Sequence, residues 1–153
     1  MDNVFASAHE CPWDPKTKTV SYFGPGTDKV IFTTLDDLAN YTVAAISSPW
    51  AEMGGMIRVE SFRTTWPGIA TSYEATHGVK THVKQLGSAQ DAMAELGRLR
   101  KVNAPDTVAK QNGLVNVLQI LRGTWDYEAV DVRHFPQVRQ TSLEDWFLQH
   151  PDY

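Results

Sequence analysis

The stretch TLDDLANYTVAAI, residues 34–46, is the most clearly marked element of this sequence. Its first four residues match a capping box, in which the Thr34 hydroxyl accepts from the Asp37 backbone N–H and the Asp37 side chain reaches back. Acids in the first turn also favour a helix start, because they oppose the positive end of the helix dipole. One face then follows at helical spacing: Leu35, Leu38, Ala39, Thr42, Val43 and Ile46. The sequence predicts an amphipathic helix here, which Pro49 stops.

Outward from this helix, short apolar runs between turn residues predict brief strands. We expect strands at residues 19–23, 30–32, 56–59 and 79–84, the last one half-buried because its apolar and polar residues alternate. Gly24-Pro25-Gly26 and Gly54-Gly55 are expected to turn the chain.

Capping signals predict the other helices. Thr64 or Thr65 begins one that ends at Gly78, a residue suited to a left-handed C-terminal cap. Residues 88–91 and 142–145 are two more capping boxes, and residues 114–121 carry apolar residues at helical spacing up to Gly123. Residues 4–8 suggest a short first helix. We therefore expect a single α/β unit over residues 1–153, with short strands and about five helices.

Composition excludes several classes of protein. The chain has 153 residues, 42% of them hydrophobic and 21% charged, which suits one globular domain. A formal charge of −4 argues against nucleic acid and anionic membrane as main partners. The single cysteine forms no internal disulfide, no apolar run approaches the ~18 residues of a membrane span, and no leader pattern opens the chain. The expected location is cytoplasmic.

The order of motifs resembles the C-terminal half of the NmrA-like family, the atypical short-chain dehydrogenases that include isoflavone-reductase-like proteins. Three stretches carry the resemblance: Met1-Asp2-Asn3-Val4, residues 23–39 with Phe23-Gly24 and Asp37-Leu38-Ala39, and residues 135–144 with Phe135-Pro136 and Thr141-Ser142-Leu143-Glu144. The resemblance covers nearly the whole chain. It implies the substrate-binding half of a Rossmann-type fold, without the Gly-rich half that cradles a dinucleotide. No nicotinamide or other cofactor is therefore expected.

Candidate chemistry concentrates in a predicted loop after Gly123. Asp126, Tyr127 and His134 are the candidate proton-transfer residues, and Trp125 could hold a flat substrate. An ordinary surface loop with anchoring aromatics is the alternative. The resemblance places the N-terminal region beside the substrate, so a second set could line the same cavity or instead pack in the core: Asn3, Phe5, Trp13, Tyr22 and Phe23.

Other catalytic or metal-binding arrangements lack their residues. His9 and Cys11 could form half of a metal site, but no second pair completes the four ligands of structural zinc. No nucleophile-elbow serine and no phosphate-binding loop is present. We expect no metal site.

Three functions fit this sequence. The first is a cofactor-independent isomerase, dehydratase or cyclase acting on a hydrophobic small molecule, with secondary metabolism of the fungal type implied by the resemblance. The second is a non-catalytic regulatory or binding module. The third is a fragment of an NADPH-dependent reductase. A closed pocket with Asp, His or Tyr inside would favour the enzyme, an open apolar patch the binding module, and an unpaired sheet edge the fragment. We also expect a homo-oligomer, because a half-module would need to cover the face that normally meets the missing half.

Overall fold

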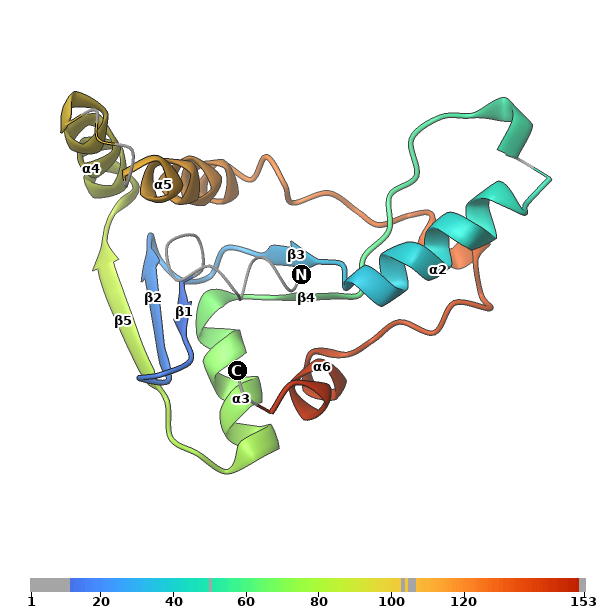
Figure 1. Ribbon diagram of the computed structural model, residues 1–153, viewed down its shortest axis with the longest axis horizontal. Coiled ribbons are helices and arrows are strands. Elements are labelled where there is room, and N and C mark those ends of the chain that lie inside the picture. Colours follow the sequence, from blue (N-terminus) through green and yellow to red (C-terminus); the bar gives the residue numbers. More distant parts are fainter. Residues whose placement is uncertain (1–11, 50, 103, 105–106, 152–153) are drawn as a thin grey trace.

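The computed structural model describes residues 12–49, 51–102, 104 and 107–151 (Figure 1). The predicted first helix at residues 4–8 lies outside these ranges. Within them the fold is mixed α/β, with five α-helices and two small sheets, which agrees with the expected class. The sheets lie in the body of the molecule. The pair α4 (Ala89–Val102) and α5 (Val108–Leu121) forms one end, and α2 (Leu35–Ile46) projects at the other end.

The larger sheet has the order β1-β2-β5. β1 (Trp13–Asp14) pairs antiparallel with β2 (Thr19–Phe23), and β2 pairs parallel with β5 (His82–Gly87). The smaller sheet pairs β3 (Val30–Phe32) antiparallel with β4 (Phe62–Thr64). The strands predicted at 19–23 and 30–32 are confirmed.

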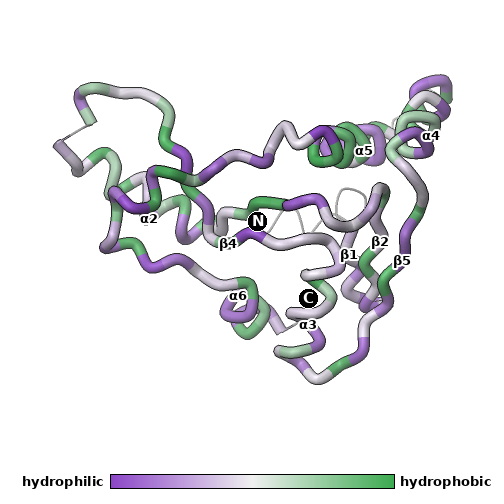
Figure 2. Tube along the Cα trace, turned by 180° about the vertical axis from the view of Figure 1, so that it is seen from behind, coloured by the Kyte–Doolittle hydropathy of each residue, from purple (hydrophilic) through white to green (hydrophobic). Residues whose placement is uncertain are grey.

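Helices α3 (Trp66–His77) and α4 contact the larger sheet. α3 begins after Thr65, whose side chain accepts from the Gly68 N–H, and ends at Gly78 with φ +67°. α4 (Ala89–Val102) and α5 (Val108–Leu121) pack on each other, and α6 (Leu143–Gln149) packs on α3. Hydrophobic and hydrophilic residues are mixed along α5 (Figure 2). The caps predicted at Thr65 and Gly78 are therefore confirmed. They could be predicted from the sequence because capping acts within one helical turn.

Two predicted strands are wrong in place or extent. Residues 56–59 form no strand, because the Arg58 N–H donates to the Asp131 carboxylate and Val59 accepts from a tyrosine side chain instead of from a strand. The strand predicted at 79–84 runs from His82 to Gly87, because the side chain of Glu74 already accepts the Thr81 N–H. β5 is also exposed on both faces rather than half-buried.

The core divides into two clusters. The larger one joins the strands to α3 and α6, and its buried members are Trp13, Val20, Val30, Phe32, Trp66, Ile69, Ala70, Tyr73, Ile120, Leu143, Trp146 and Phe147. The smaller one lies between α4 and α5 and contains Ala92, Leu96 and Leu118. Neither cluster contains a residue of α2. The helix with the clearest sequence signal therefore contributes no apolar side chain to either core cluster.

Candidate functional site

α2 (Leu35–Ile46) is turned with its apolar face outward. Its buried residues are Asp37 and Tyr41, one turn apart on one side of the helix. The predicted apolar face lies on the opposite side, where the side chain of Ile46 is 69% exposed and that of Val43 is 60% exposed. The helix itself is as predicted, but its hydrophobic side faces solvent in this structure.

Buried hydrogen bonds of Asp37 explain this orientation. Its carboxylate accepts from the Ser61 hydroxyl at 2.5 Å and from the Thr141 backbone N–H and hydroxyl at 2.8 and 2.9 Å. Thr34 caps the helix as predicted by accepting the Asp37 N–H at 3.1 Å. The reciprocal half of the capping box is absent, because the Thr34 N–H donates to Ser61 Oγ instead. A carboxylate that is only 2% exposed must keep such donors, so it turns this side of the helix inward.

Tyr41 completes the inward side of α2. Its ring makes an edge contact with Phe135 at a centroid distance of 6.0 Å. Burial raises the pKa of Tyr41, and the charges of Asp37 and Glu60 raise it further. The Tyr41 hydroxyl has no hydrogen-bond partner within the described residues. The fully buried side of α2 is thus formed by one carboxylate and one aromatic ring.

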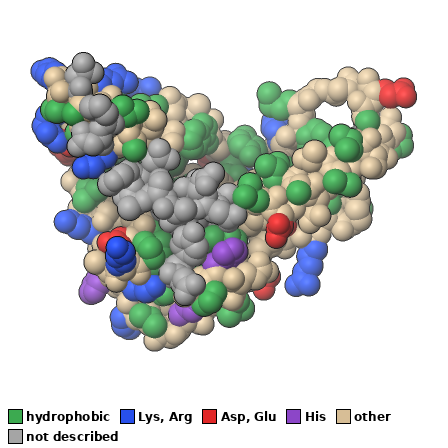
Figure 3. Space-filling model, viewed as in Figure 1, with side chains coloured by type: hydrophobic (Ala, Val, Ile, Leu, Met, Phe, Trp, Pro, Cys, Tyr) green, Lys and Arg blue, Asp and Glu red, His purple; other side chains and the backbone are tan. Residues whose placement is uncertain are grey.

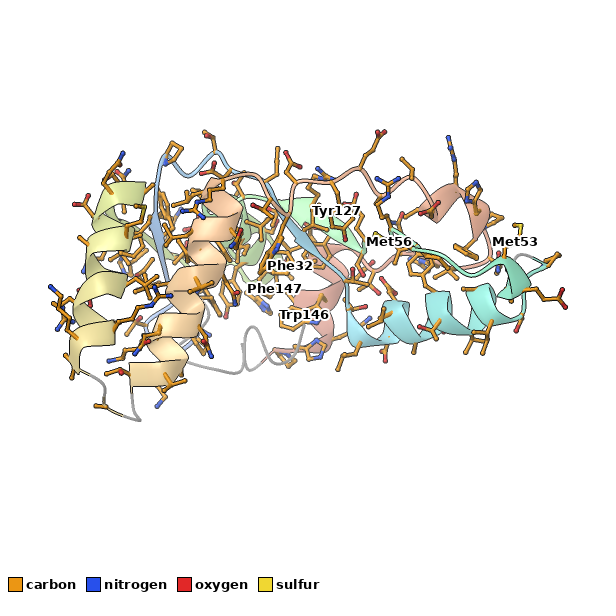
Figure 4. All side chains as sticks on the ribbon, turned by 90° about the horizontal axis from the view of Figure 1, so that it is seen from above. Phe32, Met53, Met56, Tyr127, Trp146 and Phe147 are labelled. Atoms are coloured by element: carbon orange, nitrogen blue, oxygen red, sulfur yellow. The ribbon has the colours of Figure 1, made fainter. Side chains whose placement is uncertain are left out.

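The exposed apolar surface continues beyond α2 into the loop that follows it. We call residues 35–49 and 51–57 the apolar arm; they comprise α2, the short helix η1 (Ala51–Met53) and the loop that leads back toward the body (Figure 1). The large hydrophobic side chains exposed on the apolar arm are Leu35, Leu38, Val43, Ile46, Met53, Met56 and Ile57. Figure 3 shows hydrophobic side chains gathered along this part of the surface, and Figure 4 shows Met53 near the outer end of the arm.

The apolar arm is also almost without charge. No charged residue occurs from Leu38 to Ala51, and Glu52 is the only one between Leu38 and Ile57. The remaining acids of the arm are Asp36 and the buried Asp37 at its beginning. Exposed apolar patches on single chains usually mark binding surfaces, and depletion of charge is typical of the centre of an interface. This uncharged run is the sequence signal that could have located the surface in advance.

A groove runs along one flank of α2. It lies between this helix and the segment after η3 (Val132–His134), and its volume is about 800 Å³. Val43 belongs both to the groove and to the exposed face of the apolar arm. The other residues that line the groove are Asn40, Ala44, Ser47, Ser48, Pro49, His134, Phe135, Gln137, Val138 and Arg139.

His134 is the one predicted catalytic residue that lines this groove. Its Nδ1 lies 3.4 Å from the Asp131 carboxylate, which also accepts the Arg58 N–H at 2.8 Å. A carboxylate that orients an imidazole is an arrangement used in proton transfer. The His134 side chain is one-third exposed, however, and the groove is open to solvent.

Asp126 and Tyr127 do not line this groove and instead hold their loop against β4. The Arg63 guanidinium bonds to the Asp126 carboxylate at 2.5 Å, to the Tyr127 carbonyl and to Glu60. The Tyr127 hydroxyl donates to the Val59 carbonyl at 3.1 Å. Burial raises the pKa of Tyr127, with a further contribution from the charge of Glu60. These contacts describe an anchored loop, the alternative that the sequence left open.

The described residues of the predicted second set and Trp125 lie in different parts of the fold. Trp13 is buried in the larger core cluster, 4.8 Å from the ring of Tyr73, and Tyr22 packs against the same cluster. Phe23 packs on the smaller cluster between α4 and α5, whereas Trp125 is 43% exposed. Asn3 and Phe5 lie outside the described residues. Core packing was the alternative weighed for this set, and it describes Trp13, Tyr22 and Phe23.

Two further surface features lack the marks of a binding site. A hollow of about 680 Å³ lies where β2 and β5 end, beside Asp28 and the start of α4, but the Ser88 N–H and hydroxyl there are both bonded to Asp91. β5 pairs only with β2, so its other edge has no partner strand among the described residues. β5 carries Lys84, and charged side chains, lysine especially, are a common means of discouraging strand pairing.

Comparisons with known proteins give no match: no family model, no curated protein and no solved structure corresponds to this chain. In the part of the chain that the structure describes, no helix combines the length and hydrophobicity needed to cross a bilayer. The same residues contain no group of three or more His, Cys, Asp or Glu side chains placed to hold a metal ion.

Proposed function

We propose that this chain is a non-catalytic binding module that uses the apolar arm to hold another protein chain. The observation that carries the proposal is the outward, uncharged apolar face of α2 and the loop after it. An open apolar patch is the feature expected of a binding module, whereas an enzyme needs a closed pocket around its proton-transfer groups. The NmrA-like origin and the cytoplasmic location remain part of this proposal, on the sequence resemblance and the composition.

The methionines of the apolar arm support a binding role. Met53 and Met56 are 77% and 85% exposed and flank Gly54-Gly55, where both glycines have positive φ. Methionine is flexible and polarisable, so it adapts to the shape of a partner. The exposed apolar face of α2 lies next to the groove, so a folded partner could both pack on this face and insert a side chain into the groove.

A photo-crosslinking amino acid at Val43 tests the proposal in the cells that produce the protein. Val43 is exposed at the centre of the α2 face, so irradiation should give a discrete adduct of higher mass. The matched control places the same amino acid at Arg100, an exposed residue of α4 at the opposite end of the molecule, where no adduct is expected. Absence of an adduct at Val43, or equal adducts at both positions, would refute the binding role of the arm.

A second candidate function is the cofactor-independent isomerase, dehydratase or cyclase. The pair of His134 and Asp131 beside an 800 Å³ groove favours it, since groove volumes of roughly 300–1,000 Å³ suit small hydrophobic ligands. Its test is a nuclear magnetic resonance titration of the purified chain with a set of hydrophobic ketones. Shifts at His134 and Val138 would support this function, and unchanged spectra at both residues would exclude it.

A further inference from the structure

We infer that the chain held by the apolar arm is a second copy of this chain, paired through α2 around a two-fold axis. This inference rests on the proposed function and names its partner. In such an interface the same surface is used by both copies, so it must be complementary to itself. Three observations on the apolar arm support that complementarity.

The first observation is the excess surface of the chain. Its accessible surface is 9230 Å², whereas a compact monomer of 17.1 kDa is expected to expose about 7,800 Å². The difference of about 1,400 Å² lies in the range that one protomer buries in an obligate dimer, roughly 1,000–2,500 Å². The exposed hydrophobic side chains of the arm account for part of that excess, because α2 projects from the body and covers neither core cluster.

The second observation is the distribution of charge. The whole chain carries a formal charge of −4, which opposes the approach of identical copies. The run from Leu38 to Ala51 is the longest stretch of the sequence without a charged residue, so it adds no like-charge repulsion to a contact between two copies. Asp36 and Glu52, its two acids besides the buried Asp37, stand near the two ends of that uncharged run and would flank the contact.

The third observation is the shape of the α2 surface. The ridge formed by Val43 and Ile46 lies beside the groove, and Val43 belongs to both. When two α2 helices pack antiparallel about a two-fold axis, the ridge of each copy can enter the groove of the other. The same arrangement opposes the two helix dipoles favourably and covers the groove that holds His134.

Light scattering of the purified full chain after size exclusion tests this inference. We expect twice the 17.1 kDa chain mass at micromolar concentration. The double variant Val43→Lys and Ile46→Lys should raise the dissociation constant by about a hundredfold or more, because it places four charges in the contact. The control is Leu148→Lys in α6, a residue that is 63% exposed but outside the arm, and it should leave the dimer unchanged.

The possible results separate this inference from the proposed function. If the wild-type chain is a monomer and still crosslinks through Val43 to a protein of another mass, the inference of a second copy is refuted. The proposed binding function is then retained. A monomer without any adduct refutes both. A dimer weakened equally by Leu148→Lys and by the arm variant means that the contact lies elsewhere. The substituted side chains are exposed, so each variant is expected to fold. Circular dichroism of each variant checks this, so that a change in the measured mass is not caused by unfolding.

Discussion

Replacing Asp37 by alanine should cost far more stability than replacing its neighbour Asp36. Asp37 accepts three hydrogen bonds, one from the Ser61 hydroxyl and two from Thr141, and these join segments that lie 24 and 104 residues away. A hydrogen bond to a charged group contributes roughly 1.5–3 kcal/mol, and such bonds are not additive within one network. Some of this is offset because the carboxylate no longer has to be buried. We expect a loss of about 3 kcal/mol in the free energy of unfolding.

Asp36 provides a matched control, since it lies in the same first turn of α2 but is exposed. Both variants remove one acid near the helix N-terminus, a contribution of roughly 0.3–1 kcal/mol, and both gain the helix propensity of alanine. The difference between them therefore isolates the buried network. Urea unfolding followed by tryptophan fluorescence measures it, and thermal denaturation should show Tm lower by about 6–12 °C for Asp37→Ala. Equal losses for the two variants, within about 0.5 kcal/mol, would show that the network does not hold α2.

Three further outcomes are expected. Tyr41→Phe should leave the free energy of unfolding unchanged or raise it, because the Tyr41 hydroxyl has no partner within the described residues. Tyr127→Phe should lower the free energy of unfolding by about 1 kcal/mol, because it removes the hydrogen bond to the Val59 carbonyl. Urea unfolding compares the two variants, and equal losses would contradict this prediction. Arg63→Ala should increase amide hydrogen exchange of residues 126–131, while Arg98→Ala, which removes an exposed pair, should not. The hydrogen bond from the Thr81 N–H lowers the pKa of Glu74. The ionised Glu74 carboxylate therefore stabilises the fold above its unfolded pKa of about 4.3, and this stabilisation disappears as the pH falls. The urea midpoint should drop less between pH 5 and about pH 3 in Glu74→Gln than in the wild-type chain.

Local signals in the sequence determined the helices and two of the strands. The Thr34 hydroxyl caps α2, Thr65 caps α3 and Gly78 ends it in a left-handed conformation, all as predicted. These signals act between residues three or four positions apart, so they need no knowledge of the rest of the fold. The strands at residues 19–23 and 30–32 are bounded by turn residues in the same local way.

The tertiary structure alone decided what each element contacts. An apolar stripe predicts that a helix has a hydrophobic side, but it does not say whether that side is covered by the same chain. The bonds of Asp37 to Ser61 and Thr141 turned the stripe of α2 outward. Long-range pairing likewise moved the predicted strand at 79–84 to His82–Gly87, because its register is set by β2.

The candidate site divides in the same way. The sequence indicated that residues 125–134 carry aromatic and ionisable side chains, but only the fold places Asp126 and Tyr127 in an anchor around Arg63 and His134 in the groove beside α2. The uncharged run from Leu38 to Ala51 can be identified in the sequence, but its exposure to solvent cannot. Composition fixes which side chains are available over a stretch of chain. Whether solvent or protein covers them depends on contacts between residues far apart in the sequence, here up to 104 positions.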